Sequence, residues 1–142
     1  MESVAVTRDV PRPSRWITLA GWIVSLAPLA IVLISARWKL TQDPAYVREW
    51  GRIGWQLNVM PWLAVTQLTA MALFLIPQTA VLGAVLLTGY LGGAIASYVR
   101  IEDFYPPLVP LGTALLVWLG LYLREPRLWH LLPLVRMPRK PA

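Results

Sequence analysis

The feature that most constrains this chain is a long segment without charge. Residues 53–99 contain no Asp, Glu, Lys or Arg. A soluble domain of a 142-residue chain cannot keep such a segment away from water. Hydrophobic residues make up 57% of the chain and charged residues only 14%, against roughly 25% in average soluble domains. The sequence therefore predicts a polytopic membrane protein and excludes most classes of soluble enzyme.

The counts of cysteine and histidine limit the chemistry further. The chain contains no Cys and one His. It therefore lacks a thiolate nucleophile, a Cys-ligated metal centre and two axial His ligands for a haem. We expect no catalytic residue, no metal site and no cofactor bound by this chain alone. The net charge of +6 suits basic segments at the cytoplasmic membrane surface, and we expect no nucleic-acid partner.

Hydropathy and proline positions divide the chain into four expected membrane helices. The uncharged run 16–36 would be about 31 Å long as a helix, which is enough to cross the hydrocarbon core. Pro77 divides the uncharged segment into helices at about 58–76 and 79–99. A fourth helix is expected at about 108–123. The predicted fold is all-α, a four-helix transmembrane bundle with short loops.

The rest of the chain is divided around this membrane domain. We expect a cytoplasmic tail over 1–15, the membrane domain over 16–133 and a basic tail over 134–142. Between the first two spans, Asp43 can cap a helix and Pro44 suits its first turn. The sequence therefore predicts a short interfacial helix at this point.

The distribution of basic residues predicts the orientation of the chain. Eight Lys and Arg residues lie on the side that holds both termini and the second connection, and five lie on the other side. Cytoplasmic segments carry the excess of basic residues in membrane proteins. We therefore expect a multi-pass protein with both termini in the cytoplasm.

The third expected helix carries a stripe of small residues. The stripe, called the glycine stripe below, consists of Gly89, Gly92, Gly93 and Ser97. Small residues at this spacing allow two helix backbones to approach closely. The sequence predicts helix packing here, either within the bundle, with a second copy of the chain or with another subunit.

Polar residues within the spans are few. Gln67 is the most polar residue near the expected midplane, and Tyr98 lies towards the end of the third helix. Gln67 can form an interhelical hydrogen bond or face a quinone or a lipid headgroup. No Asp or Glu lies deep in a span, which argues against a proton-coupled transporter.

Charged residues gather after the first and third helices, and the topology places both groups on the outer side. Lys39 follows the first helix, and Arg100 follows the third together with Glu102 and Asp103. We expect Arg100 to pair with Glu102 or Asp103. The group is either a set of snorkelling side chains and surface ion pairs or a site for a headgroup or small ligand.

Two segments resemble a known family. They read IPQTAVLGAVLLTGYLGGAIASYVR and LVWLGLYLREPRLWHLLPL, and Lys39-Leu40 adds a weaker likeness. The chain resembles the DoxX-like family of small bacterial integral membrane proteins. The resemblance implies a four-helix membrane bundle in the bacterial inner (cytoplasmic) membrane.

The resemblance also implies a function, and this chain differs from the family pattern at two places. Members of the family look like parts of membrane oxidoreductase assemblies, so partners would be membrane lipids and other membrane subunits or a second copy. Relatives often carry Glu where this chain has Gln67, and Thr-His-x-Arg where it has Ser97-Tyr98-Val99-Arg100. Both missing side chains are groups that move protons.

The loss of these groups favours an accessory or structural subunit over an enzyme that acts on its own. The site residues that we expect for a ligand or headgroup are Lys39, Gln67, Tyr98 and Arg100. The alternatives are a quinone-interacting oxidoreductase subunit and a small transporter or lipid-handling protein.

Overall fold

The computed structural model describes residues 14–126 and 128, and all regular structure in that part of the chain is helical. The all-α prediction is therefore confirmed. The tail expected over 134–142 and residues 1–13 of the N-terminal tail lie outside the described residues. The elements are α1 (Arg15–Thr41), α2 (Pro44–Ile53), the 3-10 helix η1 (Leu57–Val59), α3 (Met60–Leu75), α4 (Ala80–Val99) and α5 (Leu108–Arg124).

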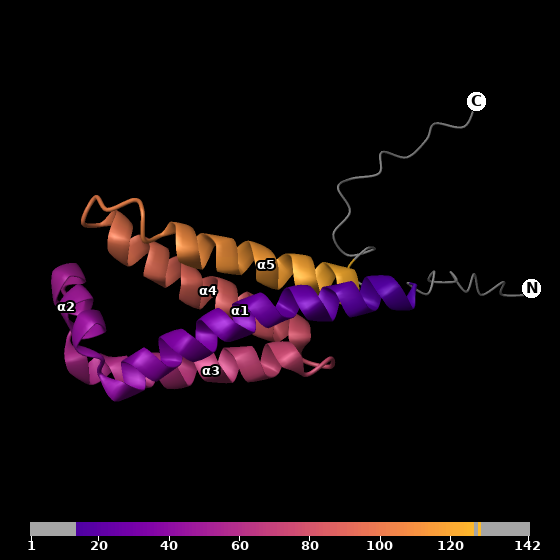
Figure 1. Cartoon of the computed structure of the whole chain (residues 1–142), viewed down its shortest axis with the longest axis horizontal. Helices are drawn as coiled ribbons and strands as arrows, with labels where there is room; N and C mark the ends of the chain where they lie inside the picture. Colours follow the sequence, from indigo (N-terminus) through magenta and orange to yellow (C-terminus); the bar gives the residue numbers. More distant parts are fainter. Residues whose placement is uncertain (1–13, 127, 129–142) are drawn as a thin grey trace, which may run out of the picture.

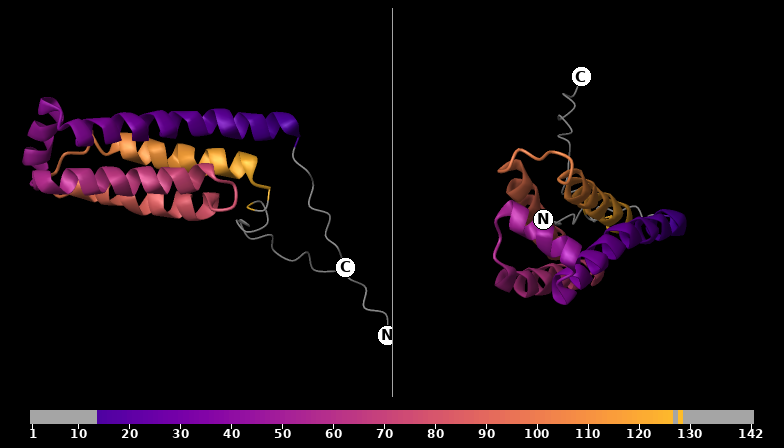
Figure 2. Two further views of the ribbon diagram at one scale, coloured as in Figure 1. Left: turned by 90° about the horizontal axis from the view of Figure 1, so that it is seen from below. Right: turned by 60° about the vertical axis from the view of Figure 1, so that its left-hand side comes forward.

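The four long helices lie side by side and alternate in direction (Figure 1). Helix α1 packs on α3 and α5, and α4 packs on the same two helices. Helix α2 lies across one end of this group, as Figure 2 shows, and we call this the α2 end. The opposite end, where α1 begins at Arg15 and α5 ends at Arg124, is called the terminal end.

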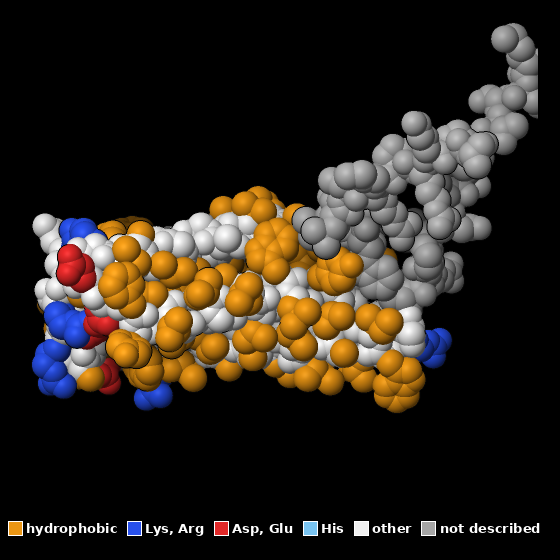
Figure 3. Space-filling model, turned by 90° about the horizontal axis from the view of Figure 1, so that it is seen from above, with side chains coloured by type: hydrophobic (Ala, Val, Ile, Leu, Met, Phe, Trp, Pro, Cys, Tyr) orange, Lys and Arg blue, Asp and Glu red, His pale blue; other side chains and the backbone are white. Residues whose placement is uncertain are grey.

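The outer surface has the character expected for a membrane protein. Three stretches of the described residues are long and apolar enough to cross a membrane: Arg15–Thr41, Leu57–Leu75 and Ala80–Val99. Helix α5 is also apolar but has only 17 residues. Hydrophobic side chains cover the flank seen in Figure 3, and charged side chains gather at the α2 end. The sequence-based prediction of membrane-spanning helices agrees with this surface.

The helix boundaries follow the sequence prediction except at the end of the first helix. The expected end at residue 36 is wrong, since α1 continues to Thr41. Two charged residues lie in the added turns, and the helix accommodates both of them. Arg37 is exposed, whereas Lys39 is buried because it finds polar partners inside the protein.

The predicted helix between the first two spans is present as α2. The Asp43 carboxylate caps it by accepting a hydrogen bond from the backbone N–H of Ala45 at 2.9 Å. Pro44 occupies the first turn, where a missing N–H has no cost. The helix ends at Gly54, whose φ of 78° lies in the left-handed region that favours glycine.

Three glycines that form no motif allow helices to approach closely towards the terminal end. A Cβ at Gly83 would lie 2.1 Å from the backbone nitrogen of Phe74. A Cβ at Gly21 would lie 2.9 Å from the backbone nitrogen of Arg124, and one at Gly120 would lie 2.5 Å from an atom of α1. These contacts join α3 to α4 and α1 to α5 at backbone distance.

The glycine stripe has different surroundings. A Cβ at Gly89, Gly92 or Gly93 would have no neighbour within 4 Å in the part of the chain that is described. Helix packing through this stripe is therefore not found between the described helices. Packing against a second copy or another subunit stays a prediction.

Candidate ligand-binding site

A cavity of about 650 Å³ lies at the α2 end. All five α-helices contribute to its lining, which is mainly aliphatic and aromatic. The cavity exists because α2 spans the ends of the long helices and does not fill the space between them. Its size and lining suit a flat or elongated apolar molecule with few polar atoms.

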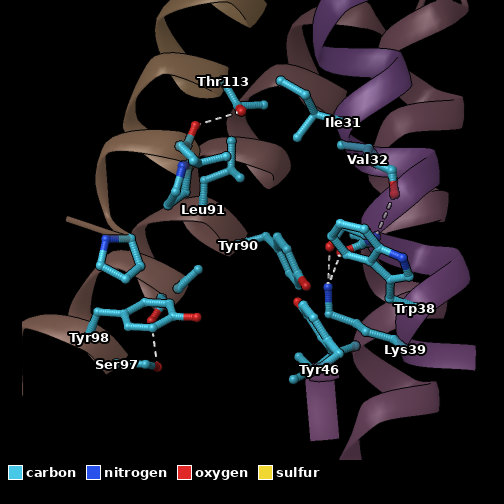
Figure 4. A pocket seen from close by; sticks show the side chains of 18 of the residues that line it. Ile31, Val32, Trp38, Lys39, Tyr46, Tyr90, Leu91, Ser97, Tyr98 and Thr113 are labelled. Carbon is cyan, nitrogen blue, oxygen red and sulfur yellow. Dashed lines mark hydrogen bonds between the residues drawn. The ribbon is translucent and has the colours of Figure 1, made fainter. Parts of the chain in front are cut away.

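Lys39 and Gln67 are polar residues of the cavity lining. Figure 4 shows Lys39 between the side chains of Trp38 and Tyr46. Lys39 is 3% exposed, and its Nζ donates hydrogen bonds to Ser35 Oγ at 2.6 Å and to Gln67 Oε1 at 2.9 Å. Gln67 is 1% exposed, and its Nε2 donates to the backbone oxygen of Val32 at 2.9 Å. These bonds fix the side chain of Lys39 and tie α1 to α3.

Two tyrosine rings complete the surroundings of Lys39. Its Nζ lies 5.4 Å from the ring centroid of Tyr46 and 5.7 Å from that of Tyr90. Figure 4 shows the hydroxyl ends of both rings beside Nζ and turned towards each other. A lysine side chain carries three N–H donors, and Ser35 and Gln67 accept two hydrogen bonds from it. The hydroxyl groups of Tyr46, which interacts with Lys39, and of Tyr90 are further polar groups beside Nζ.

Lys39 has no carboxylate partner among residues 14–126. The ion pairs found there join Arg52 to Glu49 and to Asp103. A buried lysine without an opposite charge is costly in a protein interior. Such a residue in a cavity is a candidate binding residue for a ligand that supplies acceptor oxygens.

The glycine stripe forms a wall of the same cavity. Gly89, Gly93 and Ser97 line it, and Gly92 does not. Ser97 Oγ donates to the backbone oxygen of Gly93 at 2.9 Å and accepts from Trp55 Nε1 at 3.1 Å. Because the glycines lack side chains, the backbone of α4 forms this part of the wall.

The four residues that the sequence singled out for a ligand separate into two groups. Lys39, Gln67 and Tyr98 line the cavity, whereas Arg100 does not belong to its lining. The Arg100 guanidinium donates to the backbone oxygen of Ile53 and so binds the end of α2 to the end of α4. Within the described residues, Arg100 has a structural role, because it donates a hydrogen bond to a carbonyl oxygen at the C-terminus of α2.

The expected pairing of Arg100 with Glu102 or Asp103 is wrong. Asp103 instead accepts a hydrogen bond from Arg52 of α2. Helix α2 folds over the α4–α5 connection. The Arg52 guanidinium therefore lies beside Asp103, although the two residues are far apart in the sequence. The hydrogen bond with Asp103 raises the pKa of the Arg52 guanidinium above its ordinary value.

Aromatic side chains of α2 cover the cavity at this end, and the sequence had not marked them as site residues. Ring centroids lie 5.8 Å apart for Trp38 and Tyr46, 6.2 Å for Tyr46 and Trp50, and 6.0 Å for Trp50 and Trp55. Tyr46, Trp50 and Ile53 share one face of α2 at helical spacing, and all three line the cavity. That spacing is the signal that could have identified them.

Comparison with known proteins agrees with the resemblance seen in the sequence. The DoxX-like family matches residues 13–120, which is most of the chain. A search of curated proteins found no match, and a search of solved structures found none either. The matched range includes α1 to α4, most of α5 and every residue named in the cavity. The chain is a membrane protein that belongs to the DoxX-like family.

Proposed function

We propose that the protein is a four-helix transmembrane bundle that binds a quinone-type ligand and works as a subunit of a membrane redox assembly. The observation that carries the proposal is the buried Lys39, which faces an apolar cavity and has no carboxylate partner among the described residues. A quinone is flat and apolar and carries carbonyl oxygens, so it matches this combination.

The proposed topology uses α1, α3, α4 and α5 as membrane spans. The 17 residues of α5 reach the lower end of the range that can cross a bilayer. Helix α2 would lie in the headgroup layer with its aromatic residues, which are frequent there. Both termini would face the cytoplasm of a bacterium, as the positive-inside rule predicts.

The proposed binding mode follows from the groups around Lys39. One carbonyl oxygen of the ring accepts a hydrogen bond from Lys39 Nζ, and the hydroxyl groups of Tyr46 and Tyr90 lie beside it. The ring rests on the wall formed by Gly89 and Gly93. Gln67, which stands where relatives often carry Glu, holds Lys39 in place and leaves it without an acidic neighbour.

The proposal of a subunit rests on the sequence. With one His and no Cys, the chain alone lacks the usual ligands for a haem or an iron–sulfur centre. We therefore propose that a partner protein supplies the electron carrier, while this chain binds and orients the quinone. An accessory subunit without a ligand, a transporter and a lipid-handling protein remain the competing functions.

The test is a binding measurement with a decyl-substituted benzoquinone and protein in lipid nanodiscs. Three tryptophans line the cavity, so quinone binding should quench their fluorescence: Trp38, Trp50 and Trp55. Lys39→Met should weaken binding by about tenfold or more, which corresponds to one hydrogen bond from a lysine. Arg37→Met is the matched control, because Arg37 is an exposed basic residue two positions away in the same helix. Equal binding by both variants would contradict the proposal.

A further inference from the structure

The wall of the cavity is open on one flank of the protein. Two of its lining residues, Ile34 of α1 and Val109 of α5, are 49% and 60% exposed. Both side chains are apolar, and both belong to long helices and not to the connections at the α2 end. The cavity therefore reaches the apolar outer surface at α1 and α5, and its lining is also exposed at Gly89 and Gly93 of α4.

The opening has a cause in the packing of the two helices. Near the terminal end, α1 and α5 touch at backbone distance through Gly21 and Gly120. Towards the α2 end, α1 follows α3, to which the bonds of Gln67 tie it. Helix α5 instead follows α4, to which Trp118 Nε1 is joined by a hydrogen bond to Thr88 Oγ1 at 2.9 Å. The two helices consequently separate towards the α2 end (Figure 1).

Helix α2 covers part of the end of the cavity, where Trp38 and Trp55 of the lining are 42% and 41% exposed. Trp50 and Ile53 of α2 are each 5% exposed and lie over this end. Hydrogen bonds from Arg52 to Asp103 and from Arg100 to the Ile53 backbone oxygen hold α2 against the end of α4 and the connection that follows it. Where α2 lies, a molecule that arrived along the helix axis would first have to displace it.

We propose that the ligand enters and leaves sideways through the opening between α1 and α5, directly from the hydrocarbon layer. The ligand is then an amphiphile whose polar head reaches Lys39 and whose apolar tail lies in the opening between Ile34 and Val109. The inference rests on the proposed function, because it concerns the same cavity and the same head group. It adds the route by which the ligand enters the cavity and the requirement that the ligand carries an apolar tail.

The experiment closes each route in turn with a chemical bridge. The chain has no Cys, so paired substitutions introduce the only thiols. Ile34→Cys with Val109→Cys places thiols across the opening, and Arg52→Cys with Asp103→Cys places them across the contact of α2 with the α4–α5 connection. Bis-maleimides of increasing span bridge each pair, and intact mass identifies the bridged protein. Quenching by decyl-benzoquinone in nanodiscs then gives the rate of binding.

Bridging the Ile34–Val109 pair should slow binding of the decyl-quinone by about tenfold or more, while bridging the Arg52–Asp103 pair should leave the rate nearly unchanged. A benzoquinone without a tail should bind more weakly than the decyl form to the unbridged protein. The reverse pattern, with slowing only at Arg52–Asp103, would overturn the lateral route. If neither unbridged variant nor the unmodified protein binds the quinone, the proposed function itself fails.

Discussion

Each end of this protein holds a basic side chain between its helices, and the surroundings of the two side chains differ. At the terminal end, the Arg124 guanidinium lies between the rings of Trp22 and Phe74, at 4.4 Å and 4.3 Å from their centroids, and donates to the Phe74 backbone oxygen. At the α2 end, Lys39 faces a large cavity. Arg124 is half-buried and joins helices, although its Nη1 has no hydrogen-bond partner among the described residues, whereas Lys39 is fully buried and lines a cavity large enough for a ligand.

The packing of helix backbones also differs between the two ends. Gly21, Gly83 and Gly120 bring helices into backbone contact towards the terminal end. Gly89 and Gly93 lie towards the α2 end and line open space. Glycine therefore serves close approach at one end and an unobstructed wall at the other. Stability should depend on the terminal end and ligand binding on the α2 end.

The largest effect is expected from a methyl group at the tight end. Gly83→Ala should lower the free energy of unfolding by about 3 kcal/mol or more, because the added Cβ meets the backbone of Phe74, which cannot move aside as a side chain would. Gly92→Ala in the same helix is the matched control and should change stability by less than about 1 kcal/mol. Unfolding of the detergent-solubilised protein by SDS measures both. Similar losses for the two variants would refute the contrast in packing.

Substitutions of Arg124 and Lys39 should differ in their effects on stability and on quinone binding. Arg124→Met should lower the free energy of unfolding by about 2 kcal/mol, because the Phe74 carbonyl loses its donor and two rings lose their cation. Its effect on quinone affinity should be small. Lys39→Met should weaken quinone binding by about tenfold or more, and its loss of stability should be smaller than that of Arg124→Met, because the cost of a buried charge is removed together with the hydrogen bond to Gln67. Melting curves and quinone titrations on both variants give the comparison, and an equal loss of affinity in both would contradict it.

Substitutions in the glycine stripe test whether the stripe lines a ligand cavity or forms an interface with another protein. Gly93→Leu should fill the cavity and weaken quinone binding by about tenfold while the protein stays folded. Gly92→Leu should leave binding unchanged, because Gly92 is outside the lining. Native mass spectrometry of the complexes reports assembly in parallel. If Gly92→Leu removes a partner or a second copy, the stripe also serves as the interface that its spacing predicts.

The smallest effect is expected at the exposed ion pair over the α2 end. Asp103→Asn should loosen α2 and speed hydrogen exchange of its backbone amides, with a change in melting temperature smaller than for the other variants. Glu102→Gln is the neighbouring control. The difference should vanish at molar salt concentrations, which screen exposed charges. Exchange that is equally fast in both variants at low salt would show that the pair does not hold α2.

The sequence predicts the helices well because hydropathy and charge act locally. The expected spans 58–76, 79–99 and 108–123 differ from the observed helices by no more than two residues at either end. The first helix is the exception. Whether a lysine ends a span depends on partners elsewhere in the chain, and Gln67, which lies 28 residues away, allows Lys39 to stay inside.

The site was less predictable, because a spacing of small residues does not distinguish a helix contact from a cavity wall. The glycine stripe has the motif but lines open space, whereas Gly21 and Gly83 make the close contacts without a motif. Lys39, Gln67 and Tyr98 were named from their polarity and do line one cavity, while Arg100 satisfies a helix end instead.

The proposed function requires that the α2 end holds a quinone-type ligand against Lys39. The most direct measurement is photolabelling of the protein in nanodiscs with an azido-quinone, followed by mass spectrometry of the labelled peptides. The account predicts label on the cavity segments around Lys39 and Tyr90–Tyr98, competed by unlabelled decyl-quinone and lost in Lys39→Met. Label spread along all outer faces, or concentrated around Trp22 and Arg124 at the terminal end, would contradict it.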